Sequence, residues 1–206
     1  MSEPLRDCRD LELRLVPESW RQHEGKTGIL LVAINTPHYT SLAVRLLALL
    51  IHRNEELSNR YDVRFIEIER NQSLAAIVKA IAVWRPPLIG LSVNVWNQQN
   101  CIDLSMSIKE VSPQTAVLCG GQEVTRSFTD YLREVPTFDY LIDGEGELPL
   151  QQFLHHFHRQ HGLVEPEQVS GLWYRHGGMS HFTRPADLVD NLDDLPSVVL
   201  AGLLPA

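Results

Sequence analysis

Apolar and polar positions change in regular blocks along most of the chain. Residues 28–34 (GILLVAI) are apolar almost throughout, which is typical of a strand covered on both faces. From 41 to 53 the apolar positions recur at helical spacing instead. The same change repeats four times, and it predicts strands at 62–68, 88–93, 115–119 and 138–142 and helices at 73–84, 100–111, 125–133 and 146–161. Five β-α units with short connections predict a parallel sheet wound on both faces.

The second predicted strand, DVRFIEI, alternates and is more polar than the other four. It is therefore expected to be less buried and to lie at an edge. This fits a flavodoxin-like (Rossmann-like) fold, a doubly wound α/β sheet of five parallel strands in the order 2-1-3-4-5.

The pattern changes after residue 162. Residues 169–183 predict a β-hairpin with a glycine turn at Gly177-Gly178, and residues 184–206 are extended, proline-punctuated and acidic. We therefore expect an N-terminal arm (1–27), an α/β domain (28–162), and a hairpin with an extended tail that connects to something else (163–206).

Composition narrows the classes of partner. The chain carries 18 lysine and arginine side chains against 26 aspartate and glutamate, a net charge of −8, and no basic cluster interrupts this balance. Nucleic acid is therefore not expected as the main partner. The charged N-terminus is no signal peptide, no apolar run has the length of a membrane span, and three scattered cysteines fit a reducing compartment, so we expect a cytoplasmic protein without a membrane partner.

Two predicted strands end in glycine and carboxylates. One runs into Gly120-Gly121-Gln122-Glu123, and the next runs into Asp143-Gly144-Glu145-Gly146-Glu147. Glycine brings bare backbone to the carboxyl edge of a sheet, where ligands of open α/β sheets bind. Two such edges, one helix apart, predict a wide, flat ligand. Glu145 and Glu147 have a second interpretation, as residues that favour a helix N-terminus, and both interpretations can hold.

The loops after the first and third strands add hydroxyl, amide and aromatic groups. This inventory suits a large neutral ligand rich in amides better than a phosphate. The candidate binding residues are Asn35, Thr36, His38, Tyr39, Ser41, Ser92, Asn94, Val95, Trp96, Asn97, Gly120, Gly121, Gln122, Glu123, Gly144, Glu145 and Gly146. No catalytic residue is predicted. Ser41 or Thr40 is also expected to cap the first helix.

Three other doubly wound classes do not fit these loops. The loop after the first strand, NTPHYTS, has no glycine, so it resembles neither a flavin phosphate loop nor a GxGxxG dinucleotide turn. A phosphoacceptor domain needs carboxylates where Asn35 and Asn94 stand.

The motifs HYTSLAVRLLAL, IGLSVNVWN, GGQEVT, YLIDGEGE, GLWYR and NLDDLP resemble, in this order, the N-terminal cobalamin (B12)-binding domain of B12-dependent radical SAM proteins. The resemblance covers about residues 28–200. It implies cobalamin along the carboxyl edge of the sheet. It also implies a partner, a radical SAM catalytic domain in cis or in trans, which binds a [4Fe-4S] cluster and S-adenosylmethionine.

The sequence departs from related families in two places. Other cobalamin domains supply a cobalt-ligating histidine in an Asp-x-His-x-x-Gly motif. With Asn35 at the Asp position, Pro37 stands where that histidine belongs, and His38 comes one residue late. The resemblance therefore implies base-off cobalamin with no protein ligand to cobalt or only a weak one, and no metal ligand is assigned. The cluster-binding Cys-x3-Cys-x2-Cys motif is also absent, so we expect either a domain cut from a longer protein or one that stands alone.

The resulting expectation is a cobalamin-binding module that serves a radical SAM methyltransferase or a related enzyme and is not catalytic by itself. Two alternatives stay open: a cobalamin sensor or interaction module without an enzymatic partner, and a scaffold that keeps the fold without the cofactor. A Gly121→Leu substitution is expected to weaken binding with little loss of fold.

Overall fold

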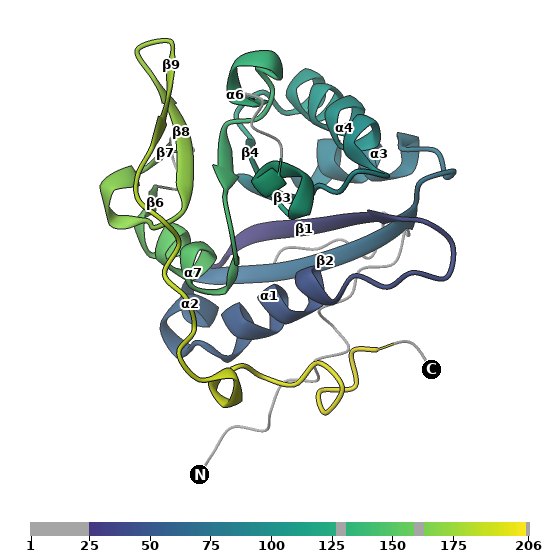
Figure 1. Cartoon of the computed structure of the whole chain (residues 1–206). Helices are drawn as coiled ribbons and strands as arrows, with labels where there is room; N and C mark the ends of the chain where they lie inside the picture. Colours follow the sequence, from purple (N-terminus) through teal and green to yellow (C-terminus); the bar gives the residue numbers. More distant parts are fainter. Residues whose placement is uncertain (1–24, 127–130, 159–162, 205–206) are drawn as a thin grey trace.

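A mostly parallel seven-stranded sheet organises the molecule (Figure 1). The computed structural model describes residues 25–126, 131–158 and 163–204. The strand order is β2-β1-β3-β4-β5-β8-β9, and the first five strands pair in parallel, which confirms the predicted 2-1-3-4-5 order. These strands are β1 (Thr27–Asn35), β2 (Tyr61–Glu69), β3 (Leu88–Ser92), β4 (Ala116–Gly120), β5 (Tyr140–Ile142), β8 (Leu172–His176) and β9 (Met179–Phe182).

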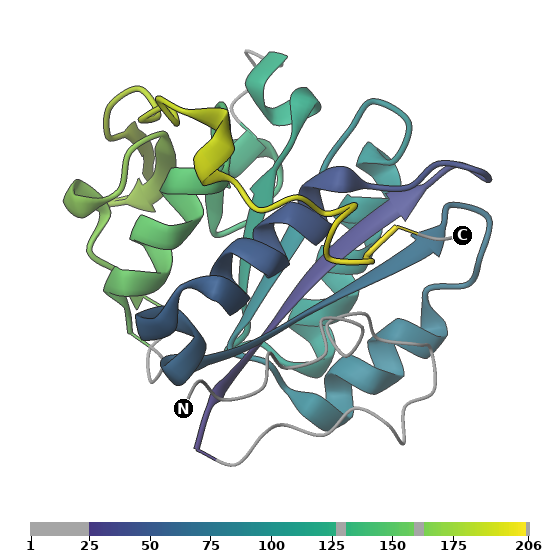
Figure 2. The ribbon, with the colours of Figure 1, turned by 90° about the horizontal axis from the view of Figure 1, so that it is seen from below.

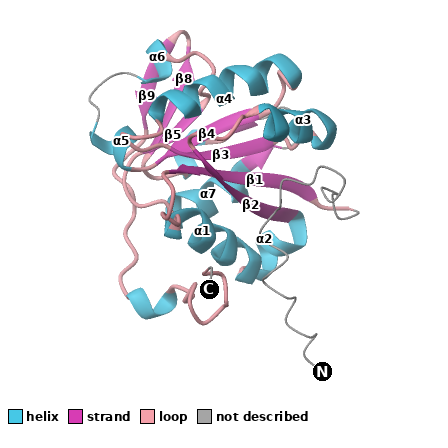
Figure 3. Cartoon of the chain, turned by 90° about the vertical axis from the view of Figure 1, so that its right-hand side faces the viewer, coloured by secondary structure: helices cyan, strands magenta, loops and turns pink. Residues whose placement is uncertain are grey.

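Helices cover both faces of the sheet. One layer contains α1, α2 and α7, and the opposite layer contains α3, α4 and α6 (Figures 1 and 3). The helices are α1 (Leu42–Arg53), α2 (Glu55–Arg60), α3 (Ala75–Trp84), α4 (Gln98–Val111), α5 (Gln122–Arg126), α6 (Tyr131–Glu134) and α7 (Glu147–His156).

Each face of the sheet has its own apolar core, because successive strand residues point to opposite sides. Leu31 of β1 and Leu118 of β4 belong to the core under α1 and α7. Their neighbours Leu30 and Val117 belong to the core under α3 and α4. Burial on both faces explains why these strands read as unbroken apolar runs in the sequence.

The edge strand β2 is more buried than its polar sequence suggests. Seven residues separate the end of α1 from the start of β2, and α2 fills most of this connection: Asn54 Oδ1 accepts from the Leu57 backbone N–H at 3.1 Å and starts α2. Helices α1 and α2 both contact β2 and cover it. Asp62 is buried beside Arg64 and accepts from its Nε at 2.8 Å, so a charged strand position is accommodated by pairing.

Two predicted helices differ from the observed ones. The predicted helix to residue 161 ends at His156, because Phe157 adopts an extended conformation and is buried against Phe153, with ring centroids 5.5 Å apart. The short strand β6 (Phe157–His158) then pairs with β7 (Leu163–Val164). The single helix predicted at 125–133 is replaced by two short helices, α5 and α6. Residues 127–130 between them lie outside the described part.

The hairpin and the tail extend the fold beyond the five parallel strands. Gly177 and Gly178 form the predicted turn with positive φ, and β8 adds to the sheet antiparallel to β5. The tail includes the short 3₁₀ helix η4 (Leu192–Asp194) and then crosses the outer face of α1 (Figure 2). Val198 and Leu203 are buried there. A second 3₁₀ helix, η3 (Pro166–Gln168), precedes β8.

Within the described ranges, no helix combines the length and the apolar character that crossing a membrane would require. Most of the predicted N-terminal arm (residues 1–24), together with Cys8, lies outside the described residues.

Candidate functional site

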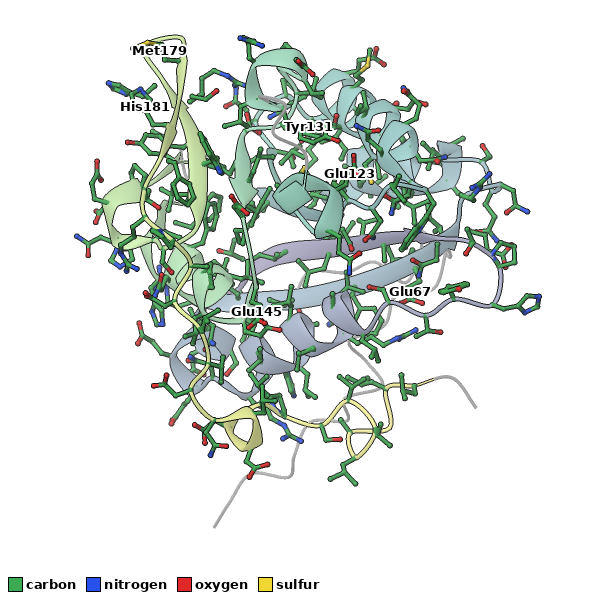
Figure 4. All side chains as sticks on the ribbon, in the orientation of Figure 1. Glu67, Glu123, Tyr131, Glu145, Met179 and His181 are labelled. Carbon is green, nitrogen blue, oxygen red and sulfur yellow. The ribbon has the colours of Figure 1, made fainter. Side chains whose placement is uncertain are left out.

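A cavity opens at the carboxyl end of the sheet, between its face and helices α1 and α7. Its volume is about 240 Å³. The walls come from the ends of β3, β4 and β5, from the first turns of α1 and from the start of α7. Figure 4 shows Glu145, one of the lining residues, where the chain enters α7 above α1. The lining residues are Leu31, Ala43, Val44, Leu47, Gly90, Leu91, Ser92, Leu118, Cys119, Gly120, Gly121, Ile142, Gly144, Glu145, Gly146, Glu147 and Leu150.

Small residues on one face of two neighbouring strands create this space. Gly90 and Ser92 of β3 point to the same side because they are two residues apart, and Ser92 pairs with Gly120 of β4. A Cβ atom at Gly120 would meet nothing closer than the Ile142 carbonyl oxygen at 3.8 Å. At Gly90 the space is partly taken by Leu31, whose Cδ2 would lie 2.7 Å from such a Cβ. The cavity is therefore open at Gly120 and Ser92 and closed beneath them by Leu31.

Gly121 has a different role from its neighbour. Its φ is +118°, and a Cβ atom there would lie 2.4 Å from the backbone oxygen of Val93. The Val93 N–H donates to the Gly120 carbonyl at 2.7 Å, so the chain after β3 packs directly on this turn. Only glycine fits both the conformation and the close approach. The expectation that Gly121→Leu leaves the fold intact is therefore wrong.

Asn97 holds the strand ends together. Its side chain is 1% exposed, and its Nδ2 donates to the carbonyl oxygens of Ile34 at 2.8 Å and Ser92 at 2.9 Å. Its Oδ1 accepts from the Asn94 N–H at 2.7 Å. All of its polar atoms are thus engaged within the protein. We assign Asn97 a positioning role, in place of the direct ligand contact expected from the sequence.

The loop after β1 is held by a carboxylate from β2. Glu67 accepts from the Ser41 backbone N–H at 2.7 Å and from Arg45 Nη2 at 3.0 Å. Ser41 occupies the N-cap position of α1, but its side chain makes no capping bond, so the cap expected from Ser41 or Thr40 is not formed. Glu67 instead fixes the N-cap residue through its backbone N–H. Within the loop, the Tyr39 N–H donates to the Thr36 carbonyl at 3.2 Å, and exposed His38 has a φ of +67°, a conformation uncommon for residues other than glycine.

Two aromatic rings are exposed at this edge. Tyr39 follows β1 and is 70% exposed, and Trp96 follows β3 and is 39% exposed. Their ring centroids are 6.5 Å apart, so two loops from neighbouring strands present one aromatic surface.

At the end of β1 and at the start of α7, one buried polar side-chain atom each has no hydrogen-bond partner among the described residues. They are Nδ2 of Asn35 and Oε2 of Glu147, respectively. One is a donor and the other is an acceptor. Buried polar groups in proteins are nearly always satisfied, so each atom indicates a partner that the chain itself does not provide.

The described cysteines are buried, and two histidines of α7 lie beside carboxylates. Cys101 and Cys119 are buried in the core under α3 and α4. Burial raises the pKa of the Cys101 thiol to about 12 and raises the pKa of Cys119 well above its usual range. His155 lies 3.1 Å from Glu56, and His156 lies 3.4 Å from Glu165. In the described part, no three histidine, cysteine or acidic residues are grouped as a metal site.

The predicted site residues separate into two groups. Ser92, Gly120, Gly121, Gly144, Glu145 and Gly146 line the cavity. The others stand at or near the same edge outside it, namely Asn35, Thr36, His38, Tyr39, Ser41, Asn94, Val95, Trp96, Asn97, Gln122 and Glu123. Sequence reasoning missed Gly90 and the apolar walls from α1, and it considered Glu147 both for ligand contact and for the helix start without listing it as a candidate. A glycine inside the buried run LIGLS was the available signal for Gly90.

Comparison with known proteins assigns the chain to a family. The model of the B12-binding domain family matches residues 41–154, more than half of the 206-residue chain. The chain belongs to the B12-binding domain family. The matched range runs from the loop before α1 to the core of α7, so this B12-binding domain contains the helices and strand ends that form the cavity.

One curated relative is the uncharacterized methyltransferase PH0819 of Pyrococcus horikoshii, which is 24% identical over 137 residues. This match covers 66% of the B12-binding domain chain and 29% of PH0819. The chain thus spans less than a third of the length of this relative.

Solved structures share the fold. The cobalamin-dependent S-adenosylmethionine radical enzyme OxsB, with aqua-cobalamin and S-adenosylmethionine bound, has a TM-score of 0.65 at 18% identity, over 93% of this chain and 29% of OxsB. The radical S-adenosylmethionine methyltransferase TsrM from Kitasatospora setae, with cobalamin and a [4Fe-4S] cluster bound, has a TM-score of 0.61 at 17% identity, over 83% of this chain and 31% of TsrM. At these identities the likeness concerns the fold alone.

The residues of the B12-binding domain fit a cobalamin. The open space at Gly120 would be filled by any side chain, and the cavity walls are largely apolar. The buried donor of Asn35 and the buried acceptor of Glu147 match a ligand whose amides and hydroxyls include both hydrogen-bond acceptors and hydrogen-bond donors. The cavity and the exposed aromatic rings lie at the carboxyl ends of the strands, where this fold class binds its ligands.

Proposed function

We propose that this domain binds base-off cobalamin for a methyl transfer or a related radical reaction. The reaction itself would take place on a radical SAM catalytic domain, present in cis or in trans, that binds the [4Fe-4S] cluster and S-adenosylmethionine. The observation that carries the proposal is the apolar cavity at the carboxyl edge, kept open by Ser92 and Gly120.

The size of the cavity decides which part of the cofactor enters. About 240 Å³ is slightly below the ~300 Å³ at which pockets for whole drug-sized ligands begin. A complete cobalamin is far larger than such a ligand, so the cavity has room for one part of it. The nucleotide tail, with its flat apolar base, suits a narrow space lined by leucine side chains and bare glycine backbone.

The corrin ring would then lie outside, across the loops that follow β1 and β3. Tyr39 and Trp96 offer it an exposed aromatic surface, and Asn35 offers a buried amide donor to one of its peripheral amides. Gly120 and Gly121 bring backbone to the same edge without a Cβ in the way.

We infer that cobalt has no protein ligand below it. Pro37 occupies the position of the ligating histidine, and proline has no group that coordinates a metal. His38 follows in an exposed turn with a positive φ. Bound cobalamin supplies a cobalt centre that carries a methyl group, and the protein would influence that centre by packing and by exclusion of water.

Titration with hydroxocobalamin tests the binding. Purified protein should change the visible spectrum of the cofactor and retain its colour after desalting. Gly120→Leu should weaken binding by tenfold or more, because the leucine side chain would occupy the cavity. A tenfold loss corresponds to ~1.4 kcal/mol, which is about the free energy of burying one apolar side chain. Val83→Leu, on exposed α3 in the opposite layer, is the matched control and should bind normally. Unchanged affinity in Gly120→Leu would contradict the placement, and absence of any binding would contradict the function.

The base-off state has its own measurement. In the reduced cob(II)alamin form, electron paramagnetic resonance detects an axial nitrogen ligand through its coupling to the unpaired electron. The bound cofactor should show no such coupling. Nitrogen coupling that disappears in His38→Ala would instead identify His38 as a ligand.

A further inference from the structure

Glu147 stands out among the residues that line the cavity. The cavity walls contain three polar side chains, those of Ser92, Glu145 and Glu147. Ser92 Oγ accepts from Asn94 Nδ2 at 3.4 Å, and Glu145 is exposed to solvent. Oε2 of Glu147 is buried and has no hydrogen-bond partner among the residues that the structure describes.

This oxygen is not used to cap α7. The N-cap position belongs to Gly146, and no side chain makes a capping bond there. The Gly146 carbonyl accepts from the Leu150 N–H at 2.9 Å, as an ordinary first helical bond. The position of Glu147 in the first turn of α7 favours its negative charge, because the helix dipole is positive at that end. The dipole therefore helps to keep an acceptor in an otherwise apolar cavity, but it does not provide a hydrogen bond to Oε2.

The chemistry of the missing partner follows from the acceptor. A carboxylate repels another anion at close range, so a phosphate group is not a suitable neighbour. A neutral donor is suitable, and a hydrogen bond from a neutral donor to a charged acceptor is stronger than one between two neutral groups. In the nucleotide tail of a cobalamin, the ribose hydroxyls are the neutral donors.

We propose that Glu147 is a specificity-determining residue that accepts a hydrogen bond from a ribose hydroxyl of the nucleotide tail. The cavity would thereby select complete corrinoids over those that lack the nucleotide, such as cobinamide. This inference rests on the proposed function, because it takes the tail to be the part that enters the cavity.

The test compares two corrinoids on matched variants. Hydroxocobalamin and diaquacobinamide are titrated against the wild type, Glu147→Ala, Glu147→Gln and Glu110→Ala. Glu147→Ala should bind hydroxocobalamin about 10- to 100-fold more weakly, the range of one hydrogen bond to a charged group. Its affinity for diaquacobinamide should stay within about twofold of the wild type. Glu147→Gln keeps an acceptor oxygen and should lose less than Glu147→Ala. Glu110→Ala, which removes an exposed glutamate of α4 in the opposite layer, should bind both corrinoids normally.

A change in the ligand repeats the test without altering the protein. Cobalamin methylated at its free ribose hydroxyls should bind the wild type more weakly than hydroxocobalamin does. In Glu147→Gln and Glu147→Ala this loss should shrink, because the two changes remove the same contact and are not additive. The comparison of the two ligands on the wild type and on Glu147→Gln remains informative even where Glu147→Ala folds poorly.

Several outcomes would overturn the proposal. An equal loss of both corrinoids in Glu147→Ala would place Glu147 against the corrin or in the stability of α7. Unchanged binding of hydroxocobalamin would show that no such bond exists. Wild-type protein that binds diaquacobinamide as tightly as hydroxocobalamin would show that the tail is not recognised, with the proposed function intact. Wild-type protein that binds neither corrinoid would remove the proposed function itself, which is a distinguishable result.

Discussion

Two adjacent glycines at the end of β4 differ in what they require. Gly120 is open to the cavity, and the nearest atom to an added Cβ is 3.8 Å away. Gly121 has a φ of +118°, and its added Cβ would lie 2.4 Å from the Val93 backbone oxygen, an atom that cannot move aside without shifting the chain. The sequence shows only the pair Gly-Gly. The structure is needed to tell which glycine faces the ligand site and which one is required by its backbone conformation.

Gly121→Ala is therefore expected to destabilise the fold, while Gly120→Ala is not. Gly121→Ala should lower the free energy of unfolding by about 2–3 kcal/mol, from left-handed strain and the clash with backbone. Gly120→Ala should stay within about 1 kcal/mol of the wild type. Urea unfolding followed by circular dichroism measures both. Equal stability of the two variants would contradict the assignment of separate roles.

The glycine edges of the site could be predicted from sequence, but its apolar walls could not. Gly120 and Gly144 follow apolar strand runs, and this pattern is visible locally. Leu47 of α1 and Leu118 of β4 look like any other core residue, because lining a cavity and filling a core require the same side chains. The cavity arises where Ser92 lies opposite Gly120, and that register is a property of strand pairing across 28 residues of sequence.

At the scale of elements, local pattern predicted most strands and helices, and tertiary contacts decided the remainder. The strand order followed from unbroken apolar runs and short connections. The end of α7 could not be predicted from local pattern, since the sequence continues through His156, Phe157 and His158 without glycine or proline. The helix ends there because Phe157 is buried against Phe153. The hairpin was predicted from its glycine turn, but its pairing with β5 depends on a contact far away in sequence.

The tail is fastened to the α1–α7 layer by Asp187. Its Oδ1 accepts from Arg184 Nη1 at 2.6 Å, and its Oδ2 accepts from Gln152 Nε2 of α7 at 2.9 Å. Its backbone N–H donates to Ser170 Oγ at 3.0 Å. The Arg184 hydrogen bond, followed by that of Gln152, holds the pKa of Asp187 below its ordinary value of 3.8.

This lowered pKa gives the tail contact a defined pH dependence. Since the folded-state pKa is depressed, the carboxylate stabilises the contact fully above about pH 3.8, and the stabilisation is lost as the pH falls through the folded value. The side-chain amide resonance of Gln152 should therefore titrate with a midpoint below 3.8. Arg184→Ala should move this midpoint upward, toward the ordinary value. A midpoint at or above 3.8 in the wild type would contradict the contact.

At the scale of the whole molecule, the two layers around the sheet differ in packing. On the α3–α4 side, Leu30, Ile89 and Val117 are fully buried and fill the strand face. On the α1–α7 side, Gly90, Ser92 and Gly120 leave the strand ends uncovered, and the tail crosses the outer face of α1. The proposed cofactor would thus replace core side chains in one layer only, between the sheet and two helices that the tail helps to hold.

This asymmetry predicts where cobalamin protects the protein from hydrogen exchange. A ligand that binds the folded state makes local opening of its own surroundings less frequent, in proportion to its concentration over Kd. At about 100 times Kd of hydroxocobalamin, amides of α1, of the first turn of α7 and of the ends of β3 and β4 should exchange at least tenfold more slowly. Amides of α3 and α4 that exchange by local opening should change by less than about twofold. Mass spectrometry of exchanged peptides measures all of these in one experiment. Gly120→Leu, whose affinity should be at least tenfold lower, supplies the control in which the same cofactor concentration gives correspondingly less protection. Protection of α3 and α4 equal to that of α1 would place the ligand outside this cavity, because α3 and α4 pack on the face of the sheet opposite to the cavity.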